Sequence, residues 1–354
     1  YLRTSSAYAK IKITLHPIRF TSIQNCRPYR STKGKSVMNS AFLNFLVFLW
    51  KTAGNNPTWR KFLYRQLRRN GKTPDYAFSK DFYGLKYKGN LNNNIDANVF
   101  FYGAFEKPLL FFLRDTLNAI KTETPKAIFM DIGANVGHHS IFLSKFASQV
   151  LAFEPYPKVN MQFKQQIAHN NISNIQIFEN GLSDRRETLN YYAPTGNNEG
   201  IGSFDESSIG KGNTSYGQLE LREGDQIIES DSWKNIKLIK IDVEGFEKKV
   251  IKGLTRTIEE ERPVIVCEIT YGQPLSFLSI EELESYLPKN YEILTFNTRK
   301  LDGSKDKRKG SLAKRSGFYE LISLTQWRSG GQDDIVMIPN EKSTIIPRQT
   351  EKHS

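Results

Sequence analysis

A short apolar run followed by a glycine turn and an apolar helix constrains the fold of this chain more than any other feature. Residues 127–130 form the apolar run, residues 131–137 (DIGANVG) form the turn, and residues 138–147 carry apolar side chains at helical spacing. This order predicts a strand, a glycine loop and a helix. Residues 149–153 and 175–178 predict two more strands, separated by a helix that begins at Pro157 and ends near His169.

The alternation of strands and helices continues toward the C-terminus. Residues 238–241 and 264–266 predict buried strands, and a helix near residues 280–286 precedes predicted strands at 291–296 and 335–338. Such alternation predicts an α/β fold with a doubly wound parallel sheet. In such sheets the ligand lies beyond the carboxyl ends of the strands. The ends of the strands are therefore where functional residues are expected.

Two acidic residues at predicted strand ends indicate the class of ligand. A glycine turn at a helix N-terminus suits any nucleotide, but Asp131, two residues before Gly133, would repel a pyrophosphate and favour a ligand with ammonium and sulfonium charges. S-adenosylmethionine is such a ligand. Glu154 follows Gly133 by 21 residues, where an acid accepts hydrogen bonds from both ribose hydroxyls. Dehydrogenases share this second feature, but the Tyr76/Lys80 pair lies upstream of the glycine loop, which disfavours hydride transfer.

Six motifs together identify a family. In chain order they are DIGANVG followed by His138 and His139, AFEP, NGLSD (180–184), GIGSF (200–204), IKIDVEGFE (239–247) and RPVIVCEI (262–269). From about residue 92 to 269 the chain resembles the FkbM-type family of S-adenosylmethionine-dependent methyltransferases. The resemblance implies a class I, Rossmann-like fold with a seven-stranded, mostly parallel sheet that ends in an antiparallel hairpin. It also implies O-methylation of a sugar or natural-product hydroxyl. A motif like Asn-Pro-Pro-Tyr is absent from the sequence, which disfavours N-methylation of adenine or glutamine.

The resemblance assigns the cofactor-binding residues. The residues of the glycine loop would shape the methionine end of the pocket, the acid after the second strand would hold the ribose, and polar residues after the third strand would border the adenine. A simple turn at residues 180–181 and a cap at Asp184 are the structural alternatives. The predicted cofactor residues are Asp131, Gly133, Asn135, Gly137, Glu154, Ser183 and Asp184.

Methyl transfer to a hydroxyl requires an in-line attack on the methyl group and a base that removes the proton of the hydroxyl. Asp242 and Glu244 follow the fourth predicted strand and are the leading candidates for the base. His139, and less so His138, is a candidate because imidazole titrates near neutral pH. Glu268 is the next candidate, with a structural ion pair to a lysine as its alternative.

Metal binding is an alternative role for the three acids among these candidates. Asp242, Glu244 and Glu268 offer the oxygen ligands that a divalent cation prefers, but nothing in their spacing requires a metal, and none is predicted. Glu247 is expected to be an acid in the first turn of a helix. The two cysteines, Cys26 and Cys267, form no zinc or disulfide pattern, which indicates a reducing compartment.

The first 74 residues differ in charge from the rest of the chain. They contain fifteen of the 50 Lys and Arg residues and no Asp or Glu, so the remaining 35 basic and 37 acidic residues give a net charge of −2. Nucleic acid is therefore disfavoured as a partner of the main domain. The basic segment matches an organelle transit segment, and Met38 is an alternative start that would make residues 1–37 dispensable for the fold.

Residues 41–50 (AFLNFLVFLW) form an apolar run that is too short to span a bilayer. A helix that packs on the domain is the favoured interpretation, since residues 57–69 continue with Trp59, Phe62 and Leu67 on one helical face. Peripheral membrane contact through residues 41–50 and a signal segment are the alternatives. The predicted location is cytoplasmic, with a membrane surface or an organelle as the alternatives.

The predicted organisation has four parts. Residues 1–74 are a helical extension, residues 75–126 are an aromatic and Asn-rich lead-in, residues 127–340 are the methyltransferase domain, and residues 341–354 are a flexible tail. A helix is predicted over residues 107–120, with Glu106 as its cap or, alternatively, as a ligand contact. The basic segment from Arg299 to Arg315 is predicted to be a loop that contacts an anionic acceptor, or else a solvated mobile loop.

These observations predict an O-methyltransferase that uses S-adenosylmethionine and a small-molecule or glycan acceptor. The first alternative is an NAD(P)-dependent oxidoreductase on a similar sheet. The second is a non-catalytic protein that binds a polyanion or a membrane through its basic N-terminus.

Overall fold

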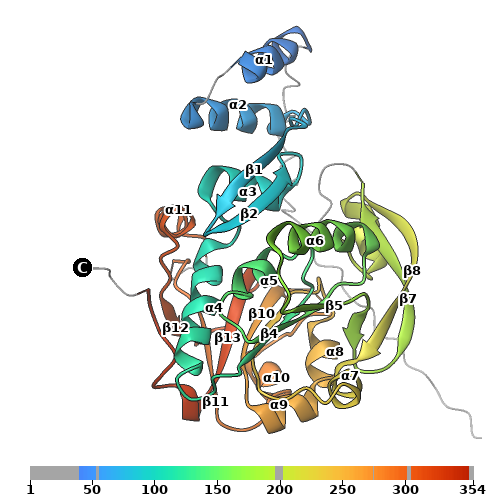
Figure 1. Cartoon of the computed structure of the whole chain (residues 1–354), viewed down its shortest axis with the longest axis vertical. Coiled ribbons are helices and arrows are strands. Elements are labelled where there is room, and N and C mark those ends of the chain that lie inside the picture. The colour runs from blue at the N-terminus through green and yellow to red at the C-terminus, as the bar shows by residue number, and fades with distance from the viewer. Residues whose placement is uncertain (1–39, 53–55, 196–201, 274, 301–303, 351–354) are drawn as a thin grey trace, which may run out of the picture.

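The computed structural model describes residues 40–52, 56–195, 202–273, 275–300 and 304–350, so the predictions for residues 1–39 and 351–354 lie outside the described residues. An eight-stranded sheet crosses the centre of the molecule (Figure 1) in the order β12-β11-β13-β10-β9-β3-β4-β5. The five strands from β10 to β5 are parallel, whereas β13 is antiparallel to β10 and β11. In sheet order the strands are β12 (Leu321–Ser323), β11 (Tyr291–Phe296), β13 (Gly331–Pro339), β10 (Val264–Tyr271), β9 (Ile236–Ile241), β3 (Ile128–Ile132), β4 (Gln149–Phe153) and β5 (Ile175–Phe178).

The α/β prediction is confirmed, but the sheet has eight strands rather than seven. The additional strand is β12, which pairs over three residues with the edge of β11. The predicted strands at β4, β5 and β11 and the predicted helix at 107–120 have the observed bounds. β10 is longer than predicted, so Glu268 lies inside the strand and not after its end.

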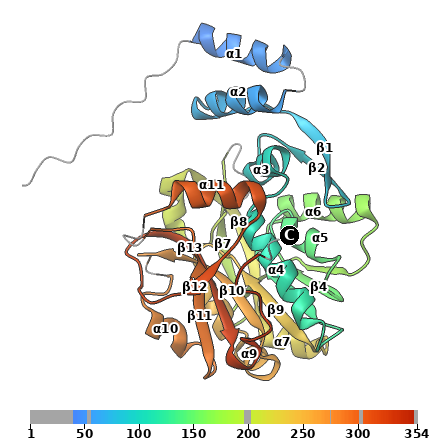
Figure 2. The same ribbon diagram turned by 90° about the vertical axis from the view of Figure 1, so that its left-hand side faces the viewer.

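Helices cover both faces of the sheet (Figure 2), because alternate side chains of each strand point to opposite faces. On one face Phe129 of β3 belongs to the same buried cluster as Leu113 and Phe142; on the other, Met130 belongs to the cluster of Ile239 and Val250. The first face carries α4 (Lys107–Ile120), α5 (His138–Leu143) and α6 (Pro157–Asn170). The second face carries α7 (Gly224–Ser230), α8 (Glu247–Lys252), α9 (Thr255–Glu261) and α10 (Ile280–Ser285).

A smaller, separate sheet follows β5 in the chain and lies beside it, at the carboxyl end of that strand. Its strand order is β6-β8-β7, with β6 parallel and β7 antiparallel to β8. These elements are β6 (Gly181–Ser183), β7 (Glu187–Pro194), β8 (Asn213–Glu223) and the 3₁₀ helix η1 (Glu206–Lys211).

The N-terminal part of the described chain forms two helices stacked on a hairpin (Figures 1 and 2). The side chain of Asn56 caps α2 by accepting hydrogen bonds from two backbone N–H groups. Trp50, Leu63 and Leu67 form a cluster that is separate from the core of the main sheet. No helix in the described part of the chain is long and apolar enough to cross a bilayer. The elements are α1 (Ser40–Thr52), α2 (Pro57–Arg69), β1 (Ala77–Phe82), β2 (Leu85–Asn90) and α3 (Asn94–Tyr102).

Two C-terminal predictions are wrong. The predicted basic loop at 299–315 contains the helix α11 (Lys307–Ser316), which Asp306 caps. The predicted flexible tail packs on the domain as far as residue 350, beyond the 3₁₀ helix η2 (Asn340–Lys342). Ile346 is buried there, and the Thr350 hydroxyl oxygen accepts a hydrogen bond from the backbone N–H of Tyr319.

Candidate functional site

A cavity of about 710 Å³ lies at the carboxyl ends of the parallel strands. Its walls include the turns after β3, β4 and β9, together with α11, the start of α4 and residues of β10, β11 and β13. The volume lies within the range of small-molecule and cofactor sites. Four residues predicted to be catalytic line this cavity: Asp242, Glu244, His139 and Glu268.

The glycine loop forms the cavity wall at β3. Gly133 has a φ of +82°, and a Cβ atom there would collide with the backbone oxygen of Asp242, so only glycine fits. The next turn residue, Asn135, donates its backbone N–H to Glu154 Oε2 at 2.9 Å, and Tyr156 donates its backbone N–H to Oε1 at 2.9 Å. These two bonds orient the Glu154 carboxyl group, while burial raises its pKa to about 7. Both oxygens retain a lone pair for a ribose hydroxyl.

Two glycine-loop residues predicted to bind the cofactor do not line the cavity. Asp131 is buried behind the wall, where its Oδ2 accepts a hydrogen bond of 2.6 Å from the Ser140 hydroxyl. At Gly137 a Cβ atom would collide with the ring of Phe163, so this glycine allows α5 to approach α6. Both residues support the loop without contacting the cavity.

The two polar residues predicted to border the adenine also face away. Ser183 is fully buried and donates its hydroxyl to Glu187 at 2.6 Å, while Asp184 forms an ion pair of 2.8 Å with Lys252. The cavity border at this point consists of Gly181 and Leu182 instead. The predicted turn after the third strand therefore does border the cavity. It does so with the backbone of Gly181 and the apolar side chain of Leu182, and not with Ser183 or Asp184.

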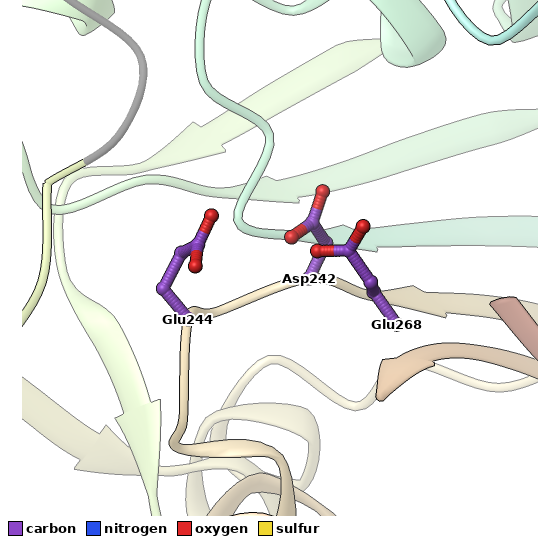
Figure 3. Close-up of side chains that lie close together, drawn as sticks. All are labelled: Asp242, Glu244 and Glu268. Atoms are coloured by element: carbon purple, nitrogen blue, oxygen red, sulfur yellow. The ribbon is translucent and has the colours of Figure 1, made fainter. Parts of the chain in front are cut away.

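Three carboxylates come together at the centre of the cavity (Figure 3). Asp242 and Glu244 lie on the turn after β9, and Glu268 lies on the neighbouring strand β10. One oxygen of each lies within 4.8 Å of the others, and Figure 3 shows the carboxyl groups around a common space. Oxygen atoms in this arrangement suit a positively charged group, and metal binding stays an untested alternative.

Lys240 is a residue of the cavity lining that the sequence reasoning missed. Its side chain is 4% exposed, and its Nζ lies 3.1 Å from Asp242 Oδ2. Strand pairing places it beside Asp131. Burial alone would lower the pKa of Lys240, but Asp242, Asp131 and Glu106 raise it well above its ordinary value. A lysine between Ile239 and Ile241 of a predicted buried strand was the available signal, since parallel strands are buried on both faces.

Glu106 is at the cavity and does not cap α4. Its backbone has a φ of +42°, and its side chain makes no capping hydrogen bond, so the cap prediction is wrong. Its Oε2 lies 3.7 Å from His139 Nε2. Burial, with Asp334 close by, raises the pKa of Glu106 well above its ordinary value.

His139 and its neighbour His138 have different environments. Burial, together with Lys240 and His138, lowers the pKa of His139 well below its ordinary value, so the ring is neutral, and its Nε2 has no hydrogen-bond partner within the described residues. His138 Nε2 lies 3.1 Å from the carbonyl oxygen of Phe105, and the ring packs against Phe82. Burial lowers the pKa of His138 to about 3, and its contacts are those of a core residue. Both rings line the cavity, and His139 is the one whose Nε2 lies near a carboxyl group, that of Glu106.

Asp334 is a further acid that the sequence reasoning missed, because it reaches the cavity only through the pairing of β13 with β10. It lies opposite Glu268 in this register. Burial and the neighbouring acids raise the pKa of Glu268 to about 11, and burial raises that of Asp334 to about 7. A neutral Glu268 carboxyl group donates a hydrogen bond and is a poor base.

The charge balance of the cavity indicates what it can hold. Eight acids line it, against four lysines, and the two histidines there have lowered pKa values. Burial raises the pKa values of four of these acids, Glu106, Glu154, Glu268 and Asp334, so the count alone does not give the charge. Asp242 and Glu244 lie together on the turn after β9, next to the glycine loop, where they favour a ligand with sulfonium and ammonium charges over a diphosphate. The lining acids are Glu106, Glu154, Asp242, Glu244, Glu268, Asp306, Asp333 and Asp334, and the lysines are Lys107, Lys240, Lys305 and Lys314.

Comparison with known proteins identifies the family of this domain. Residues 131–294 match the methyltransferase FkbM domain. Methyltransferase 1 of Beauveria bassiana is 26% identical over 145 residues, which cover 36% of this chain and 58% of that protein. Hexuronic acid methyltransferase AglP of Haloferax volcanii is 28% identical over 145 residues, which cover 39% of this chain and 54% of that protein. The chain thus spans little more than half the length of these relatives.

A solved structure of methyltransferase FkbM from Methylobacillus flagellatus KT aligns with 60% of this chain and 43% of its own, at 16% identity and a TM-score of 0.35. The resemblance to the FkbM-type family that the sequence motifs indicated is confirmed by the domain match.

Proposed function

We propose, from the premise that residues 131–294 form an FkbM-type methyltransferase domain, that this protein transfers a methyl group from S-adenosylmethionine to a hydroxyl group of a sugar. The observation that carries the proposal is the pair of acids Asp242 and Glu244 on the turn after β9, in a cavity beside the glycine loop. This charge favours a cationic methyl donor over the diphosphate of a nicotinamide cofactor.

The residues that would hold the donor lie on the turns after three successive strands, β3, β4 and β5. Gly133 and Asn135 would contact its methionine end, Glu154 its ribose, and the Gly181–Leu182 segment its adenine side. When bound, the donor supplies an electrophilic methyl group on its sulfonium. Asp242 and Glu244 would attract the positive charges, since both lie on the turn after β9, between the glycine loop and β10.

His139 is proposed as the group that takes the proton of the acceptor hydroxyl. Its ring is buried and neutral, and its Nε2 has no hydrogen-bond partner within the described residues, so the Nε2 lone pair can accept the proton. Asp242 is less suited because the Lys240 ammonium lies 3.1 Å from its carboxylate. A protonated Glu268 would donate a hydrogen bond to the acceptor and so position it.

An acidic sugar is proposed as the acceptor. Lys305 and Lys314 line the α11 side of the cavity and would pair with a carboxylate on the acceptor. Arg299 of the same basic segment is instead bound to Asp333. The name of the AglP relative, a hexuronic acid methyltransferase, supports this acceptor class.

A labelled-methyl assay tests the proposal. The full chain is incubated with methyl-labelled S-adenosylmethionine and oligosaccharides ending in either glucuronic acid or glucose, and the products are analysed by mass spectrometry. We expect methylation of the uronic acid form, and a loss of about 10²- to 10⁴-fold in kcat for His139→Gln. His169→Gln, on an exposed position of α6, is the matched control. Absence of donor binding would refute the function, whereas an unchanged kcat in His139→Gln would refute only the proposed base.

A further inference from the structure

Helix α1 is apolar on its outer side as well as on its packed side. Leu43, Leu46 and Trp50 are buried, while Phe42, Phe45 and Phe48 are 50%, 52% and 60% exposed. These three phenylalanines recur every three residues and so form one stripe on the helix. A helix that is apolar all round is normally covered on all sides. Figures 1 and 2 show α1 as the outermost helix, on the far side of α2 from the rest of the molecule.

Helix α2 adds a second exposed aromatic group. Trp59 and Phe62 stack with ring centroids 5.5 Å apart and are 43% and 47% exposed. Phe62 also lines a hollow of about 1080 Å³ between α2, the β1 strand and α11. The exposed aromatic pair and this hollow therefore adjoin at Phe62.

The hollow is lined by cations without acidic partners. Arg60, Lys61, Arg65, Lys80 and Arg315 contribute to its walls, and no carboxylate does so within the described residues. These cations contact neutral groups instead: Lys61 lies 3.6 Å from the centroid of the Tyr102 ring, and Arg65 donates to the Tyr102 hydroxyl. Exposed Lys51, Arg69 and Lys72 add further positive charge nearby in sequence. The region can thus pair with anionic groups supplied by a partner.

We propose that this region, the N-terminal helical unit (residues 40–72), docks the protein on the surface of an anionic lipid bilayer. The phenylalanines of α1 would enter the interface between headgroups and acyl chains, and the surrounding cations would pair with lipid phosphates. Charge decides against the other occupants. A second copy of the chain would bring an equally cationic unit, so the two units would repel each other. The preceding residues 1–39 would be repelled as well, because they contain eight Lys or Arg and no acid. A nucleic acid would leave the apolar stripe of α1 in water.

Vesicle binding of the full chain tests this proposal. Vesicles of phosphatidylcholine are prepared with and without about one third phosphatidylglycerol, and bound protein is measured by sedimentation. We expect binding to the anionic vesicles, and about a tenfold or greater weakening when Phe42, Phe45 and Phe48 are replaced by Ser. Replacing Lys51, Arg69 and Lys72 by Ser should reduce the preference for anionic over neutral vesicles, because the other cations of the N-terminal part remain. Binding of the wild type should weaken with salt.

The matched control replaces two exposed apolar residues elsewhere, Met161→Ser with Leu278→Ser, which are 57% and 60% exposed. This control should bind vesicles like the wild type. Circular dichroism and unchanged affinity for S-adenosylmethionine verify that each variant is folded, because Leu43, Leu46 and Trp50 are retained. Three results would overturn the proposal: equal vesicle binding by the Phe→Ser variant, no vesicle binding by the wild type, or salt-sensitive RNA binding that the Phe→Ser variant keeps.

Discussion

The cavity and the N-terminal helical unit use charge in opposite ways. In the cavity, the buried Lys240 lies close to the acids Asp242, Asp131 and Glu106. In the N-terminal helical unit, the sequence provides cations and no acids, and the described cations contact aromatic rings, amides or solvent. Buried charges are held in place by one another, whereas exposed cations remain available to a partner. The same residue type, lysine, is thus part of the internal structure in one region and, in our proposal, part of an interaction surface in the other.

The largest expected effect is at Lys240. Replacing it by Met leaves Asp131 and Asp242 without their buried counter-charge, and we expect a loss of about 3–5 kcal/mol in the free energy of unfolding. Urea unfolding measures this loss. The matched control is Lys237→Met on the same strand, where the ion pair with Glu261 is partly exposed, and the expected loss is about 1 kcal/mol. Equal losses in the two variants would contradict the proposed difference between buried and exposed lysines.

A second, smaller effect concerns pH. Burial raises the pKa values of Glu154, Asp334 and Glu247 to about 7, from ordinary values of 4.5 for the glutamates and 3.8 for the aspartate. Such groups stabilise the folded state fully below their unfolded pKa, and this contribution is lost as pH rises through the folded pKa. The melting temperature of the ligand-free protein should therefore fall between about pH 4.5 and 8.

The pH prediction has an internal control. Glu154→Gln with Asp334→Asn should flatten the decline, whereas Glu341→Gln should not. The Arg262 guanidinium lowers the pKa of Glu341 to about 2, so Glu341 does not titrate in this window. A melting temperature that rises toward about pH 8 would show that the cavity acids are ionised in the folded protein.

The smallest expected effect is in the N-terminal helical unit. Replacing Arg69 and Lys72 by Ser removes two exposed cations, and the free energy of unfolding should change by less than about 0.5 kcal/mol. Calorimetric melting measures this change. A loss as large as that of Lys237→Met would show that these cations stabilise the fold and are not reserved for a partner.

Local patterns predicted the elements of the fold better than the details of the site. The strands β4 and β5 and the helix α4 were predicted with their observed bounds, because apolar periodicity is a local signal. Pro157 and the glycine turn are local signals too, and they marked the starts of the helices that follow β4 and β3. The glycine loop and the acids after β9 were placed correctly at the cavity for the same reason.

The missed residues depend on tertiary contacts. Asp334 reaches the cavity because β13 pairs with β10, which lies more than sixty residues earlier in the chain. Glu106 follows a local pattern typical of a helix cap, but its left-handed backbone directs the side chain elsewhere. Ser183 and Asp184 turned away because Glu187 and Lys252 bind them. Lys240 is the exception, since its position between two isoleucines of a predicted buried strand was visible in the sequence.

Isothermal titration calorimetry with S-adenosylmethionine and, separately, with NAD and NADP tests the central claim that the acid-rich cavity is built for a cationic methyl donor. The account predicts saturable heat with S-adenosylmethionine, a weaker affinity in Glu154→Gln, and no heat with either nicotinamide cofactor. Heat with NAD or NADP and none with S-adenosylmethionine would contradict it.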